Sequence, residues 1–542
     1  MTAVTRQIEI GQDSPLGVLR DVFGYESFRP GQELVIRAVL EGHDCIAVMP
    51  TGAGKSLTFQ IPARLLPGTV LVVSPLISLM KDQVDALDEL DFRAAAINSS
   101  LERDERRRRV AALRAGGYEL VYCAPEALDG SLRDVIRHAP LSLLVVDEAH
   151  CISQWGHDFR PSYRRLLGLK RELGDLPVLA LTATATRQVA RDILRQLGMV
   201  KPKGYKGSFF RRNLRIHARK KGQGGDTRHE IADLVRARSG ASGIVYCLSR
   251  RTVEQTAAYL ASRGVRALPY HAGMSDVDRA ANQEAFQRDD ADVIVATIAF
   301  GMGIDKPNVR FVIHRDMPKD IESWYQEIGR AGRDGLPSDC FLFYSWADVK
   351  LHERFLDDIE DDDIRRAKRD ATVRLFRLIE RTTCRHQAIV RYFDEQIAPC
   401  GDACDVCRGV TVESLVAEAA TRSDPRLDGG GLGQALLPGR PAQGRAPLEG
   451  AGAPAAERSP SSSDAEALFE RLRALRKRLA DDRGVPAYII FNDRTLRELC
   501  ERRPTTPAEL LRVSGVGPAK LERYGSAVLA EIVRDGELTR PL

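Results

Sequence analysis

The chain has 542 residues, a length that suits about three to five domains. Apolar residues make up 43% of it, which supports sizeable cores, yet no uninterrupted apolar run is long enough to cross a membrane, so no span is expected. The formal net charge of +5 is compatible with nucleic acid without requiring it. The first residues, Met1–Arg6, lack the apolar core of a secretion signal, so we expect a cytoplasmic protein.

An aromatic and polar stretch, Phe23–Gln32, precedes the first strong strand signal. An aromatic ring can stack on a nucleobase, and the amide of Gln32 can pair with both the donor and the acceptor on an adenine edge. The Phe and Tyr residues suit a hydrophobic core equally well, so this stretch alone does not identify a site.

The segment Met49–Ser56 carries the strongest chemical signal near the N-terminus. The apolar run Asp44–Val48 before it predicts a strand, and Leu57–Leu66 after it predicts a helix. A glycine-bearing loop between them points backbone N–H groups at a phosphate, Lys55 adds a positive charge, and Ser56 offers a hydroxyl to Mg²⁺. The Walker pattern has a glycine where Met49 stands, so a simple tight loop remains the alternative.

A pair of carboxylates follows the apolar run Leu143–Val146, which predicts a buried parallel strand. Asp147 and Glu148 stand at its C-terminal end, where one carboxylate suits Mg²⁺ and the other suits a base that polarises water. A solvated acidic loop is the alternative, which the phosphate loop upstream makes less favourable.

Strands and helices alternate in two successive series, which predicts two parallel sheets in tandem, each covered by helices on both faces. The arginine-rich segment Asn98–Arg109 in the first series is expected to be a solvated helix face. The expected strands of the first series are Thr69–Ser74, Arg93–Ile97, Tyr118–Cys123, Leu143–Val146 and Val178–Leu181. Those of the second are Leu214–Ala218, Gly243–Cys247, Ala267–Tyr270, Val293–Ala296 and Phe311–Ile313.

Two arginines, Arg330 and Arg333, follow the second series and stand three positions apart. On a helix this spacing places both on one face. If the second sheet faces the first across a cleft, one of them can reach the γ-phosphate as an arginine finger. Surface salt bridging is the alternative.

Four cysteines gather within a short segment of a chain without a secretion signal: Cys384, Cys400, Cys404 and Cys407. Four thiolates at this spacing favour tetrahedral Zn²⁺ over Mg²⁺ or Ca²⁺. An iron–sulfur cluster and four unrelated thiols remain as alternatives.

Residues 421–463 are dominated by Gly, Pro, Ala, Ser and Arg and lack apolar periodicity, which predicts a disordered linker. Helical patterning returns afterwards, with leucines at Leu468, Leu472, Leu475 and Leu479. The segment Ser514–Lys520 predicts a glycine hairpin between helices, where backbone N–H groups and Lys520 can meet a phosphate. Protein contact or simple helix packing is equally compatible with this segment.

Taken together, these motifs resemble superfamily 2 helicases, and the RecQ family closely, over nearly all of residues 16–408. The C-terminal segment resembles the HRDC module of the same family. The stretches that carry the resemblance follow in the family's order: Phe23–Gln32, Thr51–Ser56, Val73–Gln83, Asp147–Pro161, Leu181–Thr186, Ala299–Pro307 and Gln326–Gly335.

The resemblance implies roles for individual residues. The residues expected to form the adenine pocket are Tyr25, Arg29 and Gln32. Those expected to bind the phosphates and Mg²⁺ are Thr51, Gly52, Gly54, Lys55, Ser56 and Asp147. Glu148 is expected to orient the attacking water, with Gln326, Arg330 and Arg333 completing the site and Arg333 as the finger. An aromatic-rich loop is expected to sense single-stranded DNA through Trp155, His157, Phe159 and Arg160, because aromatic rings stack on bases without sequence preference.

The fold class implied is α/β: two tandem RecA-like parallel-sheet lobes, a helical zinc-binding module, a disordered linker and a small all-α HRDC bundle. The expected boundaries are residues 1–208 and 209–345 for the lobes, 346–408 for the zinc-binding module, 409–463 for the linker and 464–542 for HRDC. A winged-helix domain, which often follows the zinc module in this family, is not recognisable here.

The resemblance further implies an ATP-dependent DNA helicase with 3′ to 5′ polarity that acts in repair and recombination, with ATP, Mg²⁺ and Zn²⁺ as cofactors. Expected partners are single-stranded and forked DNA, and single-strand-binding protein or other repair proteins; the expected location is the bacterial nucleoid. Without a winged helix, a translocase that anneals or remodels DNA without efficient unwinding stays open. Intact Lys55, Glu148 and Arg333 disfavour a non-enzymatic DNA-binding scaffold, and an RNA substrate is a lesser alternative because nothing in the sequence reads a 2′-hydroxyl.

Overall fold

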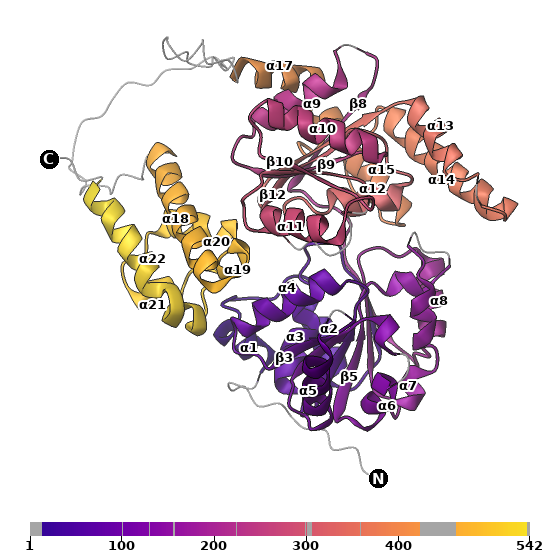
Figure 1. Ribbon diagram of the computed structural model, residues 1–542, viewed down its shortest axis with the longest axis vertical. Coiled ribbons are helices and arrows are strands. Elements are labelled where there is room, and N and C mark those ends of the chain that lie inside the picture. Colours follow the sequence, from indigo (N-terminus) through magenta and orange to yellow (C-terminus); the bar gives the residue numbers. More distant parts are fainter. Residues whose placement is uncertain are drawn as a thin grey trace, which may run out of the picture.

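The computed structural model describes residues 14–99, 101–128, 131–154, 158–223, 225–298, 300, 306–357, 359–422 and 462–538. Figure 1 shows two α/β lobes, a group of helices on the outer side of the second lobe, and a separate bundle of C-terminal helices beside both lobes. Most of the segment predicted to be a linker, residues 423–461, lies outside the described residues.

The first lobe is built on a seven-stranded parallel sheet of order β3-β4-β2-β5-β6-β1-β7. Its strands are β1 Cys45–Val48, β2 Thr69–Val73, β3 Ala94–Ile97, β4 Leu120–Cys123, β5 Leu141–Val146, β6 Val178–Thr182 and β7 Lys203–Lys206. Its helices are α1 Pro15–Asp21, α2 Gln32–Leu40, α3 Leu57–Leu65, α4 Ile77–Asp88, α5 Arg103–Arg114, α6 Ser131–His138, α7 Leu169–Glu172 and α8 Arg187–Gln196, with the 3₁₀ turns η1 Pro125–Leu128, η2 Ala149–Ile152 and η3 Pro161–Leu166.

The second lobe has a six-stranded parallel sheet of order β10-β11-β9-β12-β13-β8. Its strands are β8 Leu214–Lys220, β9 Ser242–Tyr246, β10 Ala267–Tyr270, β11 Val293–Ala296, β12 Val309–His314 and β13 Ser338–Tyr344. Its helices are α9 Thr227–Arg236, α10 Arg250–Ser262, α11 Asp276–Gln287 and α12 Ile321–Ile328.

Strand β1 shows why both faces of the first sheet are covered. Its side chains alternate, so Cys45 and Ala47 join a core with α1 to α4, while Ile46 and Val48 join the core on the other face. All four residues are buried. A strand buried on both faces reads as a continuous apolar run, which explains how the sequence revealed it.

The two predicted sheets are confirmed, but two strands were not expected. Strand β7 reads Lys-Gly-Tyr-Lys and is largely exposed at the sheet edge, so it lacks an apolar run; its pairing with β1 defines it. Strand β13 does contain an apolar run, Cys340–Tyr344, and lies between β12 and β8. Its signal was therefore present in the sequence.

Helices α13 Trp346–Arg354, α14 Asp362–Glu380, α15 Arg385–Tyr392 and α16 Asp405–Arg408 form the expected helical module after the second lobe. Helix α17 Val412–Arg422 then continues the folded part into the segment predicted as linker. It packs against α9, and Val412 is buried in the core of the second lobe.

The C-terminal bundle comprises α18 Ser462–Arg483, α19 Ala487–Ile490, α20 Asp493–Arg502, α21 Pro507–Leu510 and α22 Pro518–Leu538. Leu468, Leu472 and Leu475, which predicted the first of these helices, are buried in its core, and Leu479 is partly buried against it. Among the described residues, no helix combines the length and apolar character that crossing a bilayer requires.

Candidate active site

Residues 49–56 form the loop between β1 and α3 that the sequence predicted. Gly52 and Gly54 have φ values of 83° and 78°, which only glycine adopts without strain. A Cβ atom at Gly52 would lie 3.4 Å from the Cα of Arg333, so the loop lies next to the second lobe. The ammonium of Lys55 donates to the carbonyl of Met49 at 3.2 Å, which folds the lysine over the loop.

Gln32 supports this loop from α2. Its Nε2 donates to the carbonyl of Gly54 at 2.9 Å, and its Oε1 accepts from the backbone N–H of Arg29 at 2.8 Å. The guanidinium of Arg29 in turn donates to the carbonyl of Gly52. The amide of Gln32 is thus engaged on both sides, and it meets an adenine edge only if these contacts open.

Asp147 and Glu148 stand at the C-terminal end of β5. The backbone N–H of Glu148 donates to Asp147 Oδ1 at 2.9 Å, and Ser74 Oγ lies 3.5 Å from Asp147 Oδ2. Glu148 has a φ of 45°, a left-handed conformation that is uncommon for a residue with a side chain and that tends to occur at functional sites. Burial raises the pKa of Asp147 to about 7, the charge of Glu148 adds to this, and Lys55 opposes it.

A buried histidine extends the acid pair. His150 Nδ1 lies 2.9 Å from Thr182 Oγ1 and 3.3 Å from a carboxylate oxygen of Glu148. We assigned no role to Ser74, His150 or Thr182 from the sequence. Ser74 and Thr182 lie at the C-terminal ends of β2 and β6, the neighbours of β5 in the sheet, and the alignment of parallel strand ends was the signal that would have found them.

The second lobe contributes α12 and the loop after it. Arg330, with only 7% of its surface exposed, and Arg333 follow this helix and face the first lobe. The two lobes and the C-terminal bundle enclose a cavity of about 740 Å³. Every residue that the sequence assigned to nucleotide, magnesium or catalysis lines this cavity: Tyr25, Arg29, Gln32, Thr51, Gly52, Gly54, Lys55, Ser56, Asp147, Glu148, Gln326, Arg330 and Arg333.

The expected DNA-sensing loop is described only in part, because Trp155 and His157 lie outside the described residues. Arg160 donates through Nε to Asp158 at 3.1 Å and through its guanidinium to the carbonyl of Pro75 at 3.2 Å. Pro75 adjoins Ser74, which contacts the acid pair. A chain of contacts therefore connects this loop with Asp147.

The four predicted cysteines meet in space. The Sγ atoms of Cys384, Cys400, Cys404 and Cys407 all lie within 4.8 Å of one another. Backbone N–H groups point at two of these sulfurs: Cys400 N lies 3.3 Å from Cys384 Sγ, and Cys407 N lies 3.5 Å from Cys404 Sγ. Such donors stabilise thiolates, so the donor set fits Zn²⁺ in tetrahedral coordination.

The C-terminal bundle docks on the first lobe through a buried carboxylate. Glu89, 2% exposed, accepts hydrogen bonds from Tyr524 Oη at 2.6 Å, Arg483 Nε at 3.0 Å and Arg523 at 3.2 Å. Burial alone would raise the pKa of Glu89, but the bonds from Tyr524 and Arg483 outweigh it and hold this pKa below its ordinary value. The carboxylate is therefore charged and fully engaged at neutral pH.

Glycines bring the two backbones together beside the cavity. Gly515 N donates to the carbonyl of Gly24 at 2.9 Å, and a Cβ atom at Gly24 would lie 2.8 Å from Gly517 N. A Cβ atom at Gly517 would equally collide with the carbonyl of Val22 at 2.8 Å. The close approach therefore needs both glycines. Tyr25 lies beside this contact, because a Cβ atom at Gly515 would be 4.0 Å from its ring.

Comparison with known proteins is consistent with this arrangement. Four families match successive parts of the chain: DEAD/DEAH box helicase over residues 29–193, helicase conserved C-terminal domain over 226–335, RecQ zinc-binding over 346–408 and HRDC domain over 465–532. The ATP-dependent DNA helicase RecQ of Haemophilus influenzae is 38% identical over 96% of this chain and 96% of its own length. The chain belongs to the RecQ family. The RecQ helicase of Bacillus subtilis, also 38% identical, matches over 96% of this chain and 99% of its own length.

Solved structures with a similar fold are more distant from this RecQ-family chain. The helicase MrfA bound to DNA superposes with a TM-score of 0.52 at 17% identity, over 63% of this chain and 52% of that chain. The helicase Lhr of Mycobacterium smegmatis, bound to single-stranded DNA and AMP-PNP, gives 0.50 at 21% identity, over 62% and 48%. At these identities the likeness concerns the fold alone.

The sequence left Lys520 open to a phosphate contact or to helix packing, and in this RecQ-family chain its side chain is turned into the bundle. Its ammonium donates to the carbonyls of Ile490 at 2.7 Å and Ile489 at 3.0 Å, and burial lowers its pKa to about 8. The side chain caps the end of α19 beside the cavity. These two carbonyls engage the ammonium, so Lys520 meets a phosphate only if the two bonds open.

Glu89→Ala is expected to weaken docking of the HRDC bundle by about 1–3 kcal/mol, since the buried hydroxyl of Tyr524 loses its acceptor and Arg523 loses one of its bonds to this residue. The measurement is hydrogen–deuterium exchange of the Gly515 amide, which docking protects. Exchange should accelerate there while the core of the bundle stays protected. Glu126→Ala, at an exposed glutamate of the same lobe, is the matched control, and unchanged exchange in the Glu89 variant would contradict the role of this carboxylate.

Cys404→Ser is expected to abolish zinc binding and unfold the module around α15 and α16. Structural zinc contributes roughly 10–16 kcal/mol of apparent binding energy, which a small helical module cannot replace. Metal analysis and hydrogen exchange of residues 384–408 test this. Cys500→Ala, outside the cluster, should keep the zinc content of the parent protein; full zinc in the Cys404 variant would count against the site.

Proposed function

We propose that this RecQ-family protein is an ATP-dependent DNA helicase that unwinds duplex DNA while moving 3′ to 5′ on a single strand. One observation carries the proposal: a single cavity is lined by Lys55, Asp147 and Glu148 of the first lobe and by Arg330 and Arg333 of the second. Because the site is complete only when both lobes contribute their residues, hydrolysis in it is linked to movement of the lobes.

The residues divide the chemistry of phosphoryl transfer among them. Lys55 and the loop N–H groups hold the phosphates, and Glu148 orients the attacking water. The hydroxyl of Ser56 and the carboxylate of Asp147 are oxygen ligands of the kind Mg²⁺ prefers, and bound Mg²⁺ would neutralise charge on the phosphates. A bound cation would also favour the ionised form of Asp147 and so oppose the rise in its pKa that burial causes. Arg333, with Arg330 beside it, stabilises the charge of the transferring phosphoryl group, and Gln326 borders the same space.

Arg160 and Phe159 belong to the DNA side of the mechanism. Phe159 has its ring 5.3 Å from the guanidinium of Arg164, and Arg160 bonds to Pro75 next to the acid pair. In this proposal, bases that stack on the loop shift Arg160 and, through Pro75 and Ser74, the acid pair of Asp147 and Glu148, which couples DNA binding to hydrolysis. Trp155 and His157 would complete that platform.

We assign the work to the parts of the chain as follows. Residues 1–208 and 209–345 are the two motor lobes, 346–408 is the zinc module, 409–463 serves mainly as a connection, and 464–542 is the HRDC domain. Single-stranded and forked DNA are the substrates, in repair and recombination. Single-strand-binding protein or other repair proteins are the proposed partners, at the bacterial nucleoid.

A forked duplex with a labelled strand tests the function. With ATP and Mg²⁺, the fork that carries a 3′ single-stranded tail should separate, and one with only a 5′ tail should stay paired. Lys55→Ala should lower ATP turnover by about 10²- to 10³-fold, because a charge on the phosphates is lost. Lys203→Ala, at an exposed lysine of β7, is the control. ATP turnover over a fork that stays paired would instead favour a translocase.

Arg333→Ala is expected to lower kcat for ATP hydrolysis by roughly 10³-fold or more, since the finger acts on the transition state rather than on bound ATP. The affinity for ATP should change little. Stopped-flow binding of a fluorescent ATP analogue, alongside steady-state hydrolysis, separates the two effects. Equal losses in binding and turnover would show that Arg333 only holds the ground state.

A further inference from the structure

The segment that joins the two lobes runs between β7 and β8 and lies against the loop that carries the two arginines. Arg211, in this connector of residues 207–213, donates from Nη1 to the carbonyl of Gly329 at 2.7 Å. Its Nη2 donates to the carbonyls of Ala331 at 3.0 Å and Gly332 at 2.7 Å. One guanidinium therefore holds three of the backbone carbonyls that flank Arg330 and precede Arg333.

Asn213, two residues further on, holds the same loop from the other side. Its Nδ2 donates to the carbonyl of Gly332 at 2.9 Å and to that of Leu336 at 3.0 Å. Gly332 has a φ of 55°, and a Cβ atom there would lie 2.5 Å from Asn213 Nδ2. The loop is thus shaped to receive the connector, and the only residue type that fits at this position without strain is glycine.

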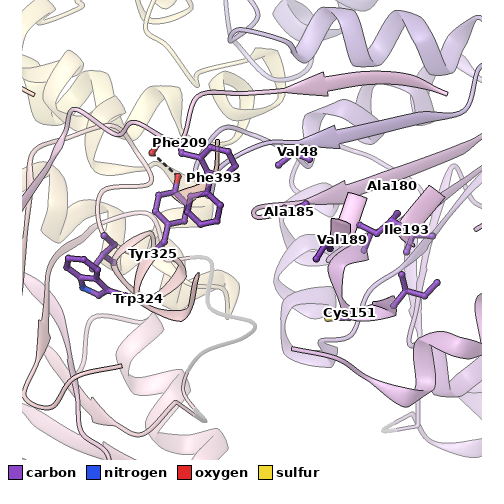
Figure 2. Close-up of a cluster of buried hydrophobic side chains, with 14 of the residues drawn as sticks. Val48, Cys151, Ala180, Ala185, Val189, Ile193, Phe209, Trp324, Tyr325 and Phe393 are labelled. Atoms are coloured by element: carbon purple, nitrogen blue, oxygen red, sulfur yellow. Dashed lines mark hydrogen bonds between the residues drawn. The ribbon is translucent and has the colours of Figure 1, made fainter. Parts of the chain in front are cut away.

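The connector is itself fixed by the zinc module. Figure 2 shows the rings of Phe209, Tyr325 and Phe393 together, with Tyr325 Oη bonded to the carbonyl of Phe209. Phe209 stacks on Phe393 with ring centroids 4.3 Å apart, and its backbone N–H donates to Glu395 at 2.6 Å. Lys206, at the end of β7, donates to the carbonyl of Phe393 at 2.6 Å. These contacts hold the start of the connector in place, just before Arg211.

The same contacts reach the phosphate loop. A Cβ atom at Gly52 would lie 3.5 Å from Nη2 of Arg211 and 3.4 Å from the Cα of Arg333. Arg211 thus lies between the backbone that presents the finger and the loop that holds the phosphates. Burial lowers the pKa of the Arg211 guanidinium, yet arginine stays protonated in proteins, so the three bonds are charge-assisted.

From this geometry we infer that Arg211, aided by Asn213, is a positioning residue for ATP hydrolysis: it sets the direction of Arg330 and Arg333 and ties the finger to the connector between the lobes. The inference rests on the proposed role of Arg333 as the finger. Arg211 touches no phosphate in this role; it acts through the backbone of the loop. When the lobes close or open, the finger then moves together with the connector.

A plainer role competes with this one. Carbonyls that follow a helix lack partners within it, and Arg211 satisfies three of them after α12. If this were its whole role, replacing it would lower thermal stability and leave the turnover of the folded protein unchanged. A positioning role predicts the reverse: a loss in kcat with ATP affinity and stability retained.

The test is Arg211→Lys, which keeps the charge but replaces the planar fork by a single ammonium nitrogen, and one nitrogen cannot stand at the positions of both Nη1 and Nη2. DNA-stimulated kcat should fall by about 10-fold or more, while KM for ATP changes by less than about 2-fold and the melting temperature is nearly unchanged. Arg212→Lys, at the exposed arginine next to it, is the matched control and should keep the parent kcat. An unchanged kcat in the Arg211 variant, or a loss fully explained by unfolding, would overturn the inference.

A double-mutant cycle with Arg333→Ala decides whether Arg211 acts through the finger. If it does, adding Arg211→Lys to the Arg333 variant should lower kcat by less than about 2-fold further, because the two losses are not additive for residues that act as a unit. Additive losses would overturn the positioning role. If Arg333→Ala itself leaves kcat unchanged, the proposed function of the finger fails, and this outcome is distinct from the failure of Arg211 alone.

Discussion

The glycine loop after β1 and the arginine loop after α12 lie so close that a Cβ atom at Gly52 would contact the backbone of Arg333, and the candidate active site depends on this close approach. The first loop needs left-handed backbone at Gly52 and Gly54, which glycine adopts without strain. Neither lobe encloses a nucleotide site by itself. The ammonium charge of Lys55 comes from the first lobe and the guanidinium charges of Arg330 and Arg333 from the second, so the separation of the lobes decides whether the cavity has all of these groups.

Two further parts of the chain hold this contact from outside. The zinc module fixes the connector through Phe393 and Glu395, and the HRDC bundle covers the Tyr25 side through its glycine hairpin. Ion pairs across the bundle involve both lobes: Arg483 with Glu89 in the first and Lys477 with Asp290 in the second. The Lys477–Asp290 pair is partly exposed and weakens with salt, whereas the cluster around the buried carboxylate of Glu89 is screened less. The bundle therefore forms part of the wall of the cavity.

Several levels of this structure were readable from local sequence. Buried parallel strands are short apolar runs, so five of the seven strands in the first sheet were expected as such and β1 was expected from the run before the phosphate loop. The spacing of Cys384, Cys400, Cys404 and Cys407 along the chain was enough to predict a zinc site, because the ligands lie close together in sequence. Strand β7 could not be found in this way, because an exposed edge strand has no apolar pattern and exists through its pairing with β1. Helix α17 was missed because its apolar face is short, and the packing of that face against α9 is not visible in the sequence.

By itself, the sequence determined the strand–loop–helix unit around Lys55, the acid pair at the end of its strand, the arginine pair and the four thiols, since each depends on neighbours close along the chain. Tertiary structure alone decided that Gln32 is engaged by Gly54, that Lys520 points into its own bundle, and that Arg211 holds the arginine loop. It also decided that Glu89 receives Tyr524, a residue 435 positions away. Such pairs carry no local pattern: their geometry is set by how whole sheets and helices pack, and a charged side chain reads the same in sequence whether it meets solvent, a ligand or a distant backbone carbonyl.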